Sequence, residues 1–120
     1  MMEKRIHQIN EYLKKQLWMD FEVCQTDFLT VILSGKTDGL SKEKIAIAFK
    51  EPYMLSCVFL FTYDCEENFI EIVEGNEAYK INCQYGVPRG NYIFKIMNTN
   101  IGGNMYIVAK DISVEIFDKA

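Results

Sequence analysis

The sequence has little of what most catalytic and metal sites require. It contains one histidine, His7, and its four cysteines (Cys24, Cys57, Cys65 and Cys83) form no C-x-x-C pair. A structural zinc site needs four Cys or His ligands at characteristic spacings, so we expect no metal site. The chain also lacks a nucleophile elbow, a dinucleotide-binding glycine motif and a paired-carboxylate pattern. We therefore predict no cofactor, no catalytic residues and a protein that is not an enzyme.

Basic residues and long apolar runs are also scarce. Lys and Arg number 13 against 17 Asp and Glu, which gives a net charge of −4 and an isoelectric point near 5.0. Nonspecific nucleic-acid binding depends on a basic face that displaces counterions, so we expect no nucleic-acid partner. The uncharged stretch Pro52–Tyr63 is shorter than the about 20 apolar residues that cross a bilayer, so we expect no membrane association.

The start of the chain lacks the apolar segment of a secretory signal, since it reads Met-Met-Glu-Lys-Arg-Ile-His-Gln. We therefore expect a cytoplasmic protein, in which the four cysteines are reduced thiols. In the strand patterns described below, Cys57 and Cys83 fall at apolar positions. We expect both to behave as small buried hydrophobic residues.

Apolar residues are plentiful enough to build a core. They make up 49% of the 120 residues, and aromatic residues make up 13%. This composition excludes a disordered chain and fits a single domain over residues 1–120. Residues 3–18 have the spacing of an amphipathic helix, and their apolar stripe consists of Ile6, Ile9, Leu13 and Leu17. We expect this helix to pack on a sheet, with Trp18 docking its end.

Residues 20–120 have the patterns of β structure. Pro52–Tyr63 is apolar on both faces of a strand, which predicts a central strand covered on both sides. Shorter segments recur at intervals of about ten residues, and turns separate them. The predicted strands are 21–24, 27–34, 43–50, 52–63, 69–73, 78–85, 91–97, 105–110 and 112–117.

These segments predict a mainly β fold. Its architecture is an antiparallel β-sandwich or barrel-like domain of eight or nine strands, with the N-terminal helix packed on it. The alternative is an α+β domain, in which a single curved antiparallel sheet holds the helix on its concave side.

An acidic block spans residues 64–77. It contains six acidic residues and no basic one: Asp64, Glu66, Glu67, Glu71, Glu74 and Glu77. Such a block is usually a solvated face. It also suits a basic partner, because complementary charge raises the association rate and the specificity. These six residues are our first candidates for partner binding.

Arg89 is the seventh candidate. It is one of two arginines and lies at the tip of the turn 86–90, where Pro88 suits the second position of a type I turn. Arginine is enriched among the residues that dominate binding interfaces, so an exposed Arg89 would serve as an anchor. The alternative is an ordinary turn residue.

Three classes of function fit these observations. The favoured one is a non-enzymatic, acidic interaction protein that binds another protein, for example as an inhibitor or neutralising partner of a basic macromolecule. The second is a β-sandwich or barrel that binds a sugar or an apolar molecule, and its candidate contact residues are Tyr79, Tyr85, Tyr92, Phe94 and Tyr106. The third is an enzyme with a carboxylate or cysteine site. A homodimer formed through a sheet edge or the helix stripe also fits the pattern.

Overall fold

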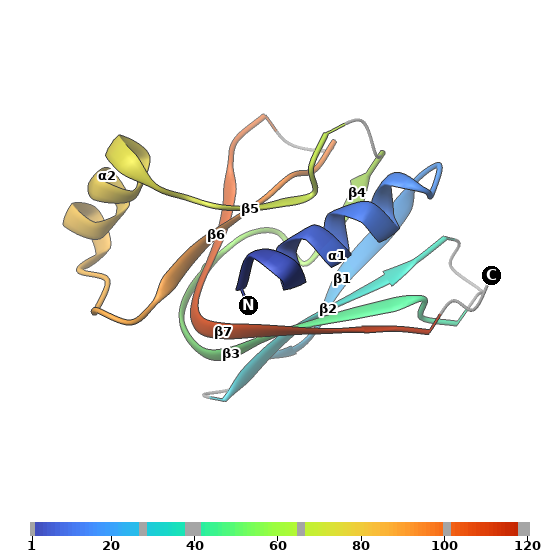
Figure 1. Cartoon of the computed structure of the whole chain (residues 1–120), viewed down its shortest axis with the longest axis horizontal. Coiled ribbons are helices and arrows are strands. Elements are labelled where there is room, and N and C mark those ends of the chain that lie inside the picture. Colours follow the sequence, from blue (N-terminus) through green and yellow to red (C-terminus); the bar gives the residue numbers. More distant parts are fainter. Residues whose placement is uncertain (1, 27–28, 38–41, 65–66, 100–101, 118–120) are drawn as a thin grey trace.

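The computed structural model describes residues 2–26, 29–37, 42–64, 67–99 and 102–117, which form one curled antiparallel sheet and two helices (Figure 1). The strands are β1 (Met19–Thr26), β2 (Thr30–Lys36), β3 (Ile45–Ser56), β4 (Leu60–Tyr63), β5 (Ile70–Ile72), β6 (Tyr92–Ile96) and β7 (Met105–Ile116). The helices are α1 (Met2–Lys14) and α2 (Gly75–Tyr85). The strands lie in the order β4-β1-β2-β3-β7-β6-β5. No helix in the described part of the chain is long and apolar enough to cross a membrane.

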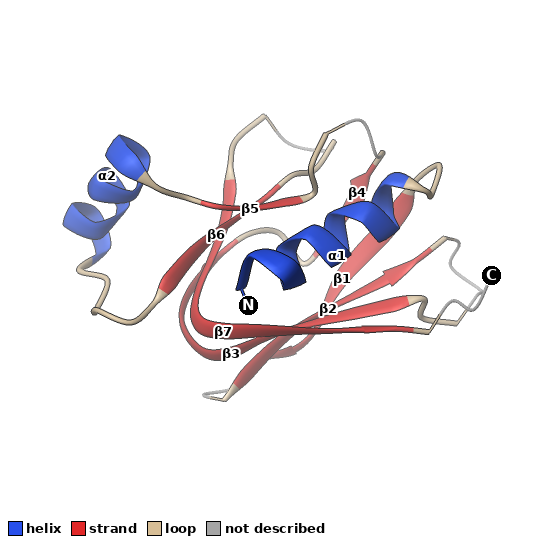
Figure 2. Cartoon of the chain, in the orientation of Figure 1, coloured by secondary structure: helices blue, strands red, loops and turns tan. Residues whose placement is uncertain are grey.

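The sandwich predicted from the sequence is wrong, because all of the described strands belong to one sheet. Its two central strands, β3 and β7, are 12 residues long each and pair from Ile45 opposite Ile116 to Ser56 opposite Tyr106. Because β3 and β7 are long enough to run through both halves of the sheet, the two halves belong to one continuous sheet. The sheet curls into a half-barrel, and Figure 2 shows α1 lying inside the curl. This matches the alternative of a single curved sheet with a helix on its concave side.

The curl has a local origin in β3. Glu51 adopts a left-handed backbone conformation, with φ at 50°, and the register with β7 shifts between Pro52 and Met54. Proline has no N–H to donate to the ladder, and a bulge bends its strand and increases the twist. The pair Glu51-Pro52 therefore turns the sheet midway along its longest strands.

The main core fills the space between α1 and the concave face. Ile9 and Leu13 are fully buried there, as the helical stripe predicts. Phe21 and Phe69 stack beside them with ring centroids 4.5 Å apart. The helix ends at Lys14, earlier than predicted. Leu17 is 89% exposed and Trp18 is exposed as well, so neither docks the helix end.

The segment predicted as the strand 78–85 is instead helix α2. Its Ile81 is buried, whereas Tyr79, Cys83 and Tyr85 are exposed, so the expectation of a buried Cys83 is also wrong. Gly86 ends the helix in the left-handed conformation and donates its N–H to the carbonyl of Asn82. Ile81 packs in a second, smaller core on the convex face together with Val73, Ile93 and Val108.

The segment predicted as the central strand is divided. Its first part, up to Ser56, ends β3, and its last part forms β4 at an edge of the sheet. Leu60 on β4 is 70% exposed, and Phe59 is exposed just before it, so the stretch is not covered on both sides. At the end of the chain, the two predicted strands 105–110 and 112–117 are one continuous strand, β7.

Candidate functional site

The acidic block is spread over three parts of the structure. Asp64 and Glu67 lie between β4 and β5, Glu71 lies in β5, Glu74 immediately precedes α2 and Glu77 lies in its first turn. Glu66 lies outside the described residues. The side chains of Asp64, Glu67, Glu71 and Glu74 are exposed. These four residues therefore present negative charge on the connection between β4 and β5, on β5 and just before α2.

Glu77 differs from the rest of the block because its partly exposed carboxylate is paired with other side chains of the protein. It accepts a hydrogen bond of 2.6 Å from the Tyr106 hydroxyl, and its carboxylate lies 3.4 Å from the Lys95 ammonium. The Tyr106 hydrogen bond and the Lys95 charge lower the pKa of Glu77. Burial and the neighbouring Glu77 raise the pKa of Tyr106. This cluster ties α2 to β6 and β7.

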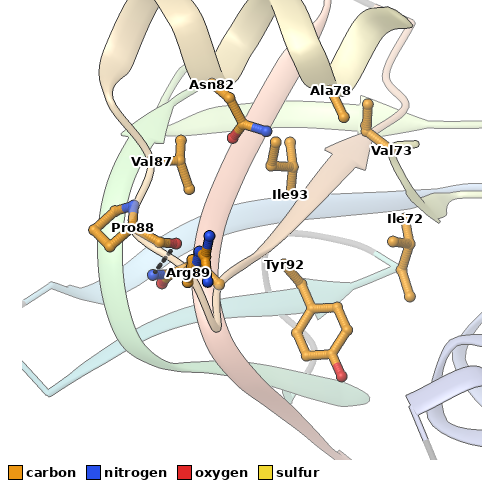
Figure 3. Close-up of a pocket in the computed structure, with 10 residues that line it drawn as sticks. Ile72, Val73, Ala78, Asn82, Val87, Pro88, Arg89, Tyr92 and Ile93 are labelled. Carbon is orange, nitrogen blue, oxygen red and sulfur yellow. Dashed lines mark hydrogen bonds between the residues drawn. The ribbon is translucent and has the colours of Figure 1, made fainter. Parts of the chain in front are cut away.

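Arg89 lies between two hollows, which we call together the Arg89 groove. The first has a volume of about 250 Å³ and lies between α2 and β6, where Ala78 and Asn82 project from the helix towards Ile93 (Figure 3). The second has a volume of about 350 Å³ and lies beside the β3 bulge. Three residues line both hollows: Pro88, Arg89 and Asn91.

The groove is held in shape by a tie between β3 and the end of α2. The Tyr53 hydroxyl donates to the carbonyl of Tyr85 at 2.6 Å and approaches that of Gly86 at 3.2 Å. The last carbonyls of a helix lack partners within it, so this hydroxyl acts as a C-terminal cap. The chain that follows, residues 86–91, is thereby fixed against the bulge of β3.

The charges in the groove are unevenly distributed. Arg89 is exposed and forms no ion pair with any described residue, whereas the other arginine, Arg5, pairs with Asp111. Among the described residues lining the first hollow, Arg89 alone carries a charge. The second hollow adds Lys110 and Glu51, which lie 3.6 Å apart as an ion pair. Arg89 is thus the unneutralised charge of the groove.

Asn91 contributes a hydrogen-bonding group that nothing in the described structure satisfies. Its Nδ2 donates to the carbonyl of Pro88 at 3.1 Å. Its Oδ1 is buried and accepts no hydrogen bond from the described residues. A buried polar atom without a partner costs free energy, and such exceptions in native structures call for an explanation.

Exposed apolar side chains surround these polar groups. Leu29 and Tyr53 line the second hollow, Tyr92 lines the first, and all three are exposed. Of these residues, sequence reasoning singled out Arg89 and Tyr92. It missed Tyr53 and Asn91. The only sequence signals for them are that Tyr53 follows the Glu51-Pro52 break and that Asn91 follows the turn 86–90.

The described residues offer little for catalysis. They contain no group of three His, Cys, Asp or Glu side chains placed to hold a metal ion, and His7 is exposed on α1. Burial raises the pKa of the Cys57 thiol to about 11, which disfavours the reactive thiolate. The concave side of the sheet, where a barrel would hold a small ligand, is filled by α1. The arrangement suits binding on the outer surface.

Comparison with known proteins assigns no family. No protein-family model, no curated protein and no solved structure matches the chain. Function therefore has to be inferred from the groove itself.

Proposed function

We propose that this protein is a non-enzymatic binding protein that holds a segment of another protein in the Arg89 groove. One observation carries the proposal: an exposed arginine, without an ion pair in the described structure, separates two hollows whose walls combine apolar and polar side chains. Arginine and tyrosine dominate the energetics of many interfaces, and the groove presents Tyr53 and Tyr92 beside Arg89.

The shape of the groove favours an extended chain over a compact molecule. Small-molecule sites are usually single concave pockets that bury most of the ligand. Here the two hollows lie on either side of one turn, at Pro88 and Arg89. An extended segment places successive side chains in separate hollows, as peptides do in many recognition grooves.

The charge of the groove favours a partner segment that carries negative charge. Lys110 is offset by Glu51, which leaves Arg89 to attract an anion. Complementary charge contributes mainly to the association rate and to the specificity of an interface. The partner segment expected here is therefore acidic, although the protein as a whole has a net charge of −4.

A second candidate function is binding of a basic partner through the acidic block. The exposure of Asp64, Glu67, Glu71 and Glu74 supports it. Glu77 contributes less to this surface, because its carboxylate is occupied by Tyr106 and Lys95.

Capture from a lysate of the source cells, compared between variants by quantitative mass spectrometry, tests both candidates. Arg89→Glu alters the groove, Lys4→Glu makes the same charge change on an exposed position of α1, and a triple variant replaces Glu67, Glu71 and Glu74 by Lys. We expect a protein that the wild type and Lys4→Glu retain and that Arg89→Glu loses. Circular dichroism of each variant checks that it is folded.

Loss of the captured protein with the triple variant alone would favour the acidic block instead. Equal retention by all four proteins would contradict both candidates. Salt adds a further check, because an interaction steered by charge weakens as ionic strength rises.

A further inference from the structure

Helix α2 rests on the sheet through a single buried side chain. All 11 residues of α2 are described, and of these only Ile81 is buried. Helix α1, by contrast, buries Met2, Ile9, Asn10 and Leu13. Segments with few buried apolar contacts open at a lower free energy than the core of a protein does. Separation of α2 from the sheet therefore costs less than unfolding of the sheet.

The apolar cluster under α2 is separate from the main core. Ile81 packs on the convex face against Val73, Ile93 and Val108, whereas the main core lies on the concave face. Val108 and Ile107 are neighbours on β7 and both are fully buried, but Val108 belongs to the second core and Ile107 to the main core. Loss of α2 from its place thus leaves the main core covered.

Glycines in the left-handed conformation lie at both ends of α2. Gly75 is the first residue of the helix, with φ at 68°, and Gly86 follows the last, with φ at 63°. A Cβ at Gly75 would meet nothing within 4 Å, so packing does not require glycine there. Glycine changes its backbone angles at low cost, and hinges consist of a few residues at the ends of an element. The two glycines are therefore placed to act as hinges.

Hydrogen bonds from the sheet hold each end of α2. Near its start, the Tyr106 hydroxyl donates to the Glu77 carboxylate at 2.6 Å, and this carboxylate lies 3.4 Å from the Lys95 ammonium. At its end, the Tyr53 hydroxyl donates to the Tyr85 carbonyl at 2.6 Å. A hydrogen bond to a charged group is stronger than one between neutral groups. The bond between Tyr106 and Glu77 is therefore the stronger of the two.

We propose that α2 is a hinged flap, which swings away from the convex face as one unit about Gly75 and Gly86 while the sheet stays folded. The hydrogen bond between Tyr106 and Glu77 is the latch that keeps the flap closed. In the open form the second core is exposed to solvent, and the main core stays buried.

The flap regulates the Arg89 groove. The first hollow of the groove lies between α2 and β6, and Ala78 and Asn82 form its wall on the helix side (Figure 3). Opening of the flap removes this wall, so the groove is complete only when the flap is closed. This consequence rests on the proposed function, whereas the motion of the flap does not.

Labelling of thiols introduced into β7 tests the motion. Val108→Cys places a thiol under α2, and Ile107→Cys, at the adjacent residue, places one in the main core. A fully buried thiol reacts only when the structure around it opens, so we expect iodoacetamide to modify Val108→Cys at least about tenfold faster, as measured by peptide mass spectrometry. Ile107→Cys removes the larger side-chain volume, so any destabilisation that it causes works against this result.

Urea distinguishes opening of the flap from unfolding of the whole protein. The sensitivity of an opening to urea scales with the surface that it exposes. Below the unfolding midpoint, the labelling rate of Val108→Cys should therefore rise with urea at most about half as steeply as that of Ile107→Cys. Hydrogen exchange of the unsubstituted protein makes the same comparison: the amides of α2 should share one urea dependence, shallower than that of the β3 and β7 amides.

The latch is tested in the Val108→Cys background. Tyr106→Phe removes the hydroxyl that bonds to Glu77 and should raise the labelling rate at least about tenfold. Tyr79→Phe makes the same change at an exposed position of α2 and should leave the rate unchanged.

Three results would overturn the inference: equal labelling of the two introduced thiols, equal urea dependence of α2 and of the central strands, or an unchanged rate with Tyr106→Phe. These measurements contain no partner, so they decide the motion of the flap whatever the groove binds. The capture experiment with Arg89→Glu decides the proposed function separately, and its failure would leave the flap without the groove as its target.

Discussion

The side chain of Asn10 closes one edge of the sheet by bonding to both backbone groups of Ile70. Its Nδ2 donates to the Ile70 carbonyl at 2.9 Å, and its Oδ1 accepts the Ile70 N–H at 3.0 Å. Ile70 belongs to β5, the last strand of the sheet, whose outward-facing groups have no neighbouring strand. Helix α1 thus supplies at this point the pairing that a further strand would give.

Replacing Asn10 should destabilise the protein strongly. Asn10 is 5% exposed, so Asn10→Leu keeps the volume filled but leaves two backbone groups without partners. Each such group costs about 1–3 kcal/mol, and we expect the free energy of unfolding to fall by about 2–4 kcal/mol. Urea denaturation measures the change. Gln8→Leu, at an exposed position of the same helix, is the control, and a similar small effect in both variants would contradict the prediction.

Gly35 lies in β2, although the sequence predicts a turn there. Glycine is required at this position because the surrounding core leaves no room for a side chain. A Cβ at this position would lie 2.6 Å from Met19 Sδ, 2.7 Å from Ile45 Cγ2 and 2.9 Å from Phe21 Cε1. Gly35→Ala should therefore cost about 1–3 kcal/mol, the usual range for overpacking a core. Gly103→Ala is the matched control, because a Cβ there meets nothing within 4 Å. Equal denaturation midpoints for the two variants would contradict the prediction and would show that the core rearranges to accept the added methyl group.

The tie between Glu77 and Tyr106 should make stability depend on pH. The Tyr106 hydrogen bond, with Lys95, holds the pKa of Glu77 below its usual range. Because the folded pKa is the lower one, the contribution is present above the ordinary glutamate pKa of about 4.3 and is lost as the pH falls through the folded value. Urea denaturation between pH 3 and pH 7 should show a smaller loss on acidification in Glu77→Gln than in the wild type.

Two further variants sharpen this test. Tyr106→Phe removes the donor and should also flatten the pH dependence, whereas Glu74→Gln, at the exposed position before α2, should leave it unchanged. The pKa of Tyr106 is raised, so its contribution has the opposite sign and is lost as the pH rises above its ordinary value of about 10. An identical acid profile in the wild type and both cluster variants would contradict the assigned role.

The cysteines should differ in reactivity. Burial raises the pKa of Cys57 to about 11, so at pH 8 about one molecule in a thousand carries the thiolate that reacts. Cys24 and Cys83 are exposed. Labelling with iodoacetamide in a Cys65→Ser background, followed by peptide mass spectrometry, should modify these two at least about tenfold faster than Cys57. A Cys57 labelling rate equal to theirs would contradict the prediction and would show that the structure around Cys57 opens often enough to expose the thiol.

Local patterns in the sequence predicted the helices and strands in which apolar residues recur with the period of the element itself. The amphipathic stripe placed α1 and its buried Ile9 and Leu13. Alternating residues placed the first part of β3 at 43–50, although the strand continues to Ser56, and they placed β6 at 91–97, close to its observed bounds. The same rule failed at Ala78–Tyr85, where alternation suits a strand, because helical packing of Ile81 against Ile93 and Val108 prevails. Side-chain periodicity records which face is apolar but not which backbone pairing is available.

The sequence by itself therefore determined a mainly β protein with an N-terminal helix and an exposed Arg89 on a turn. Only the tertiary structure decided that one curled sheet forms in place of two, since this depends on pairing β3 with β7, far away along the chain. It also brought Pro52 and Tyr53, Arg89 and Asn91, and Lys110 together around the groove. A groove made of segments so far apart in the sequence has no local signature, because its shape arises from long-range packing.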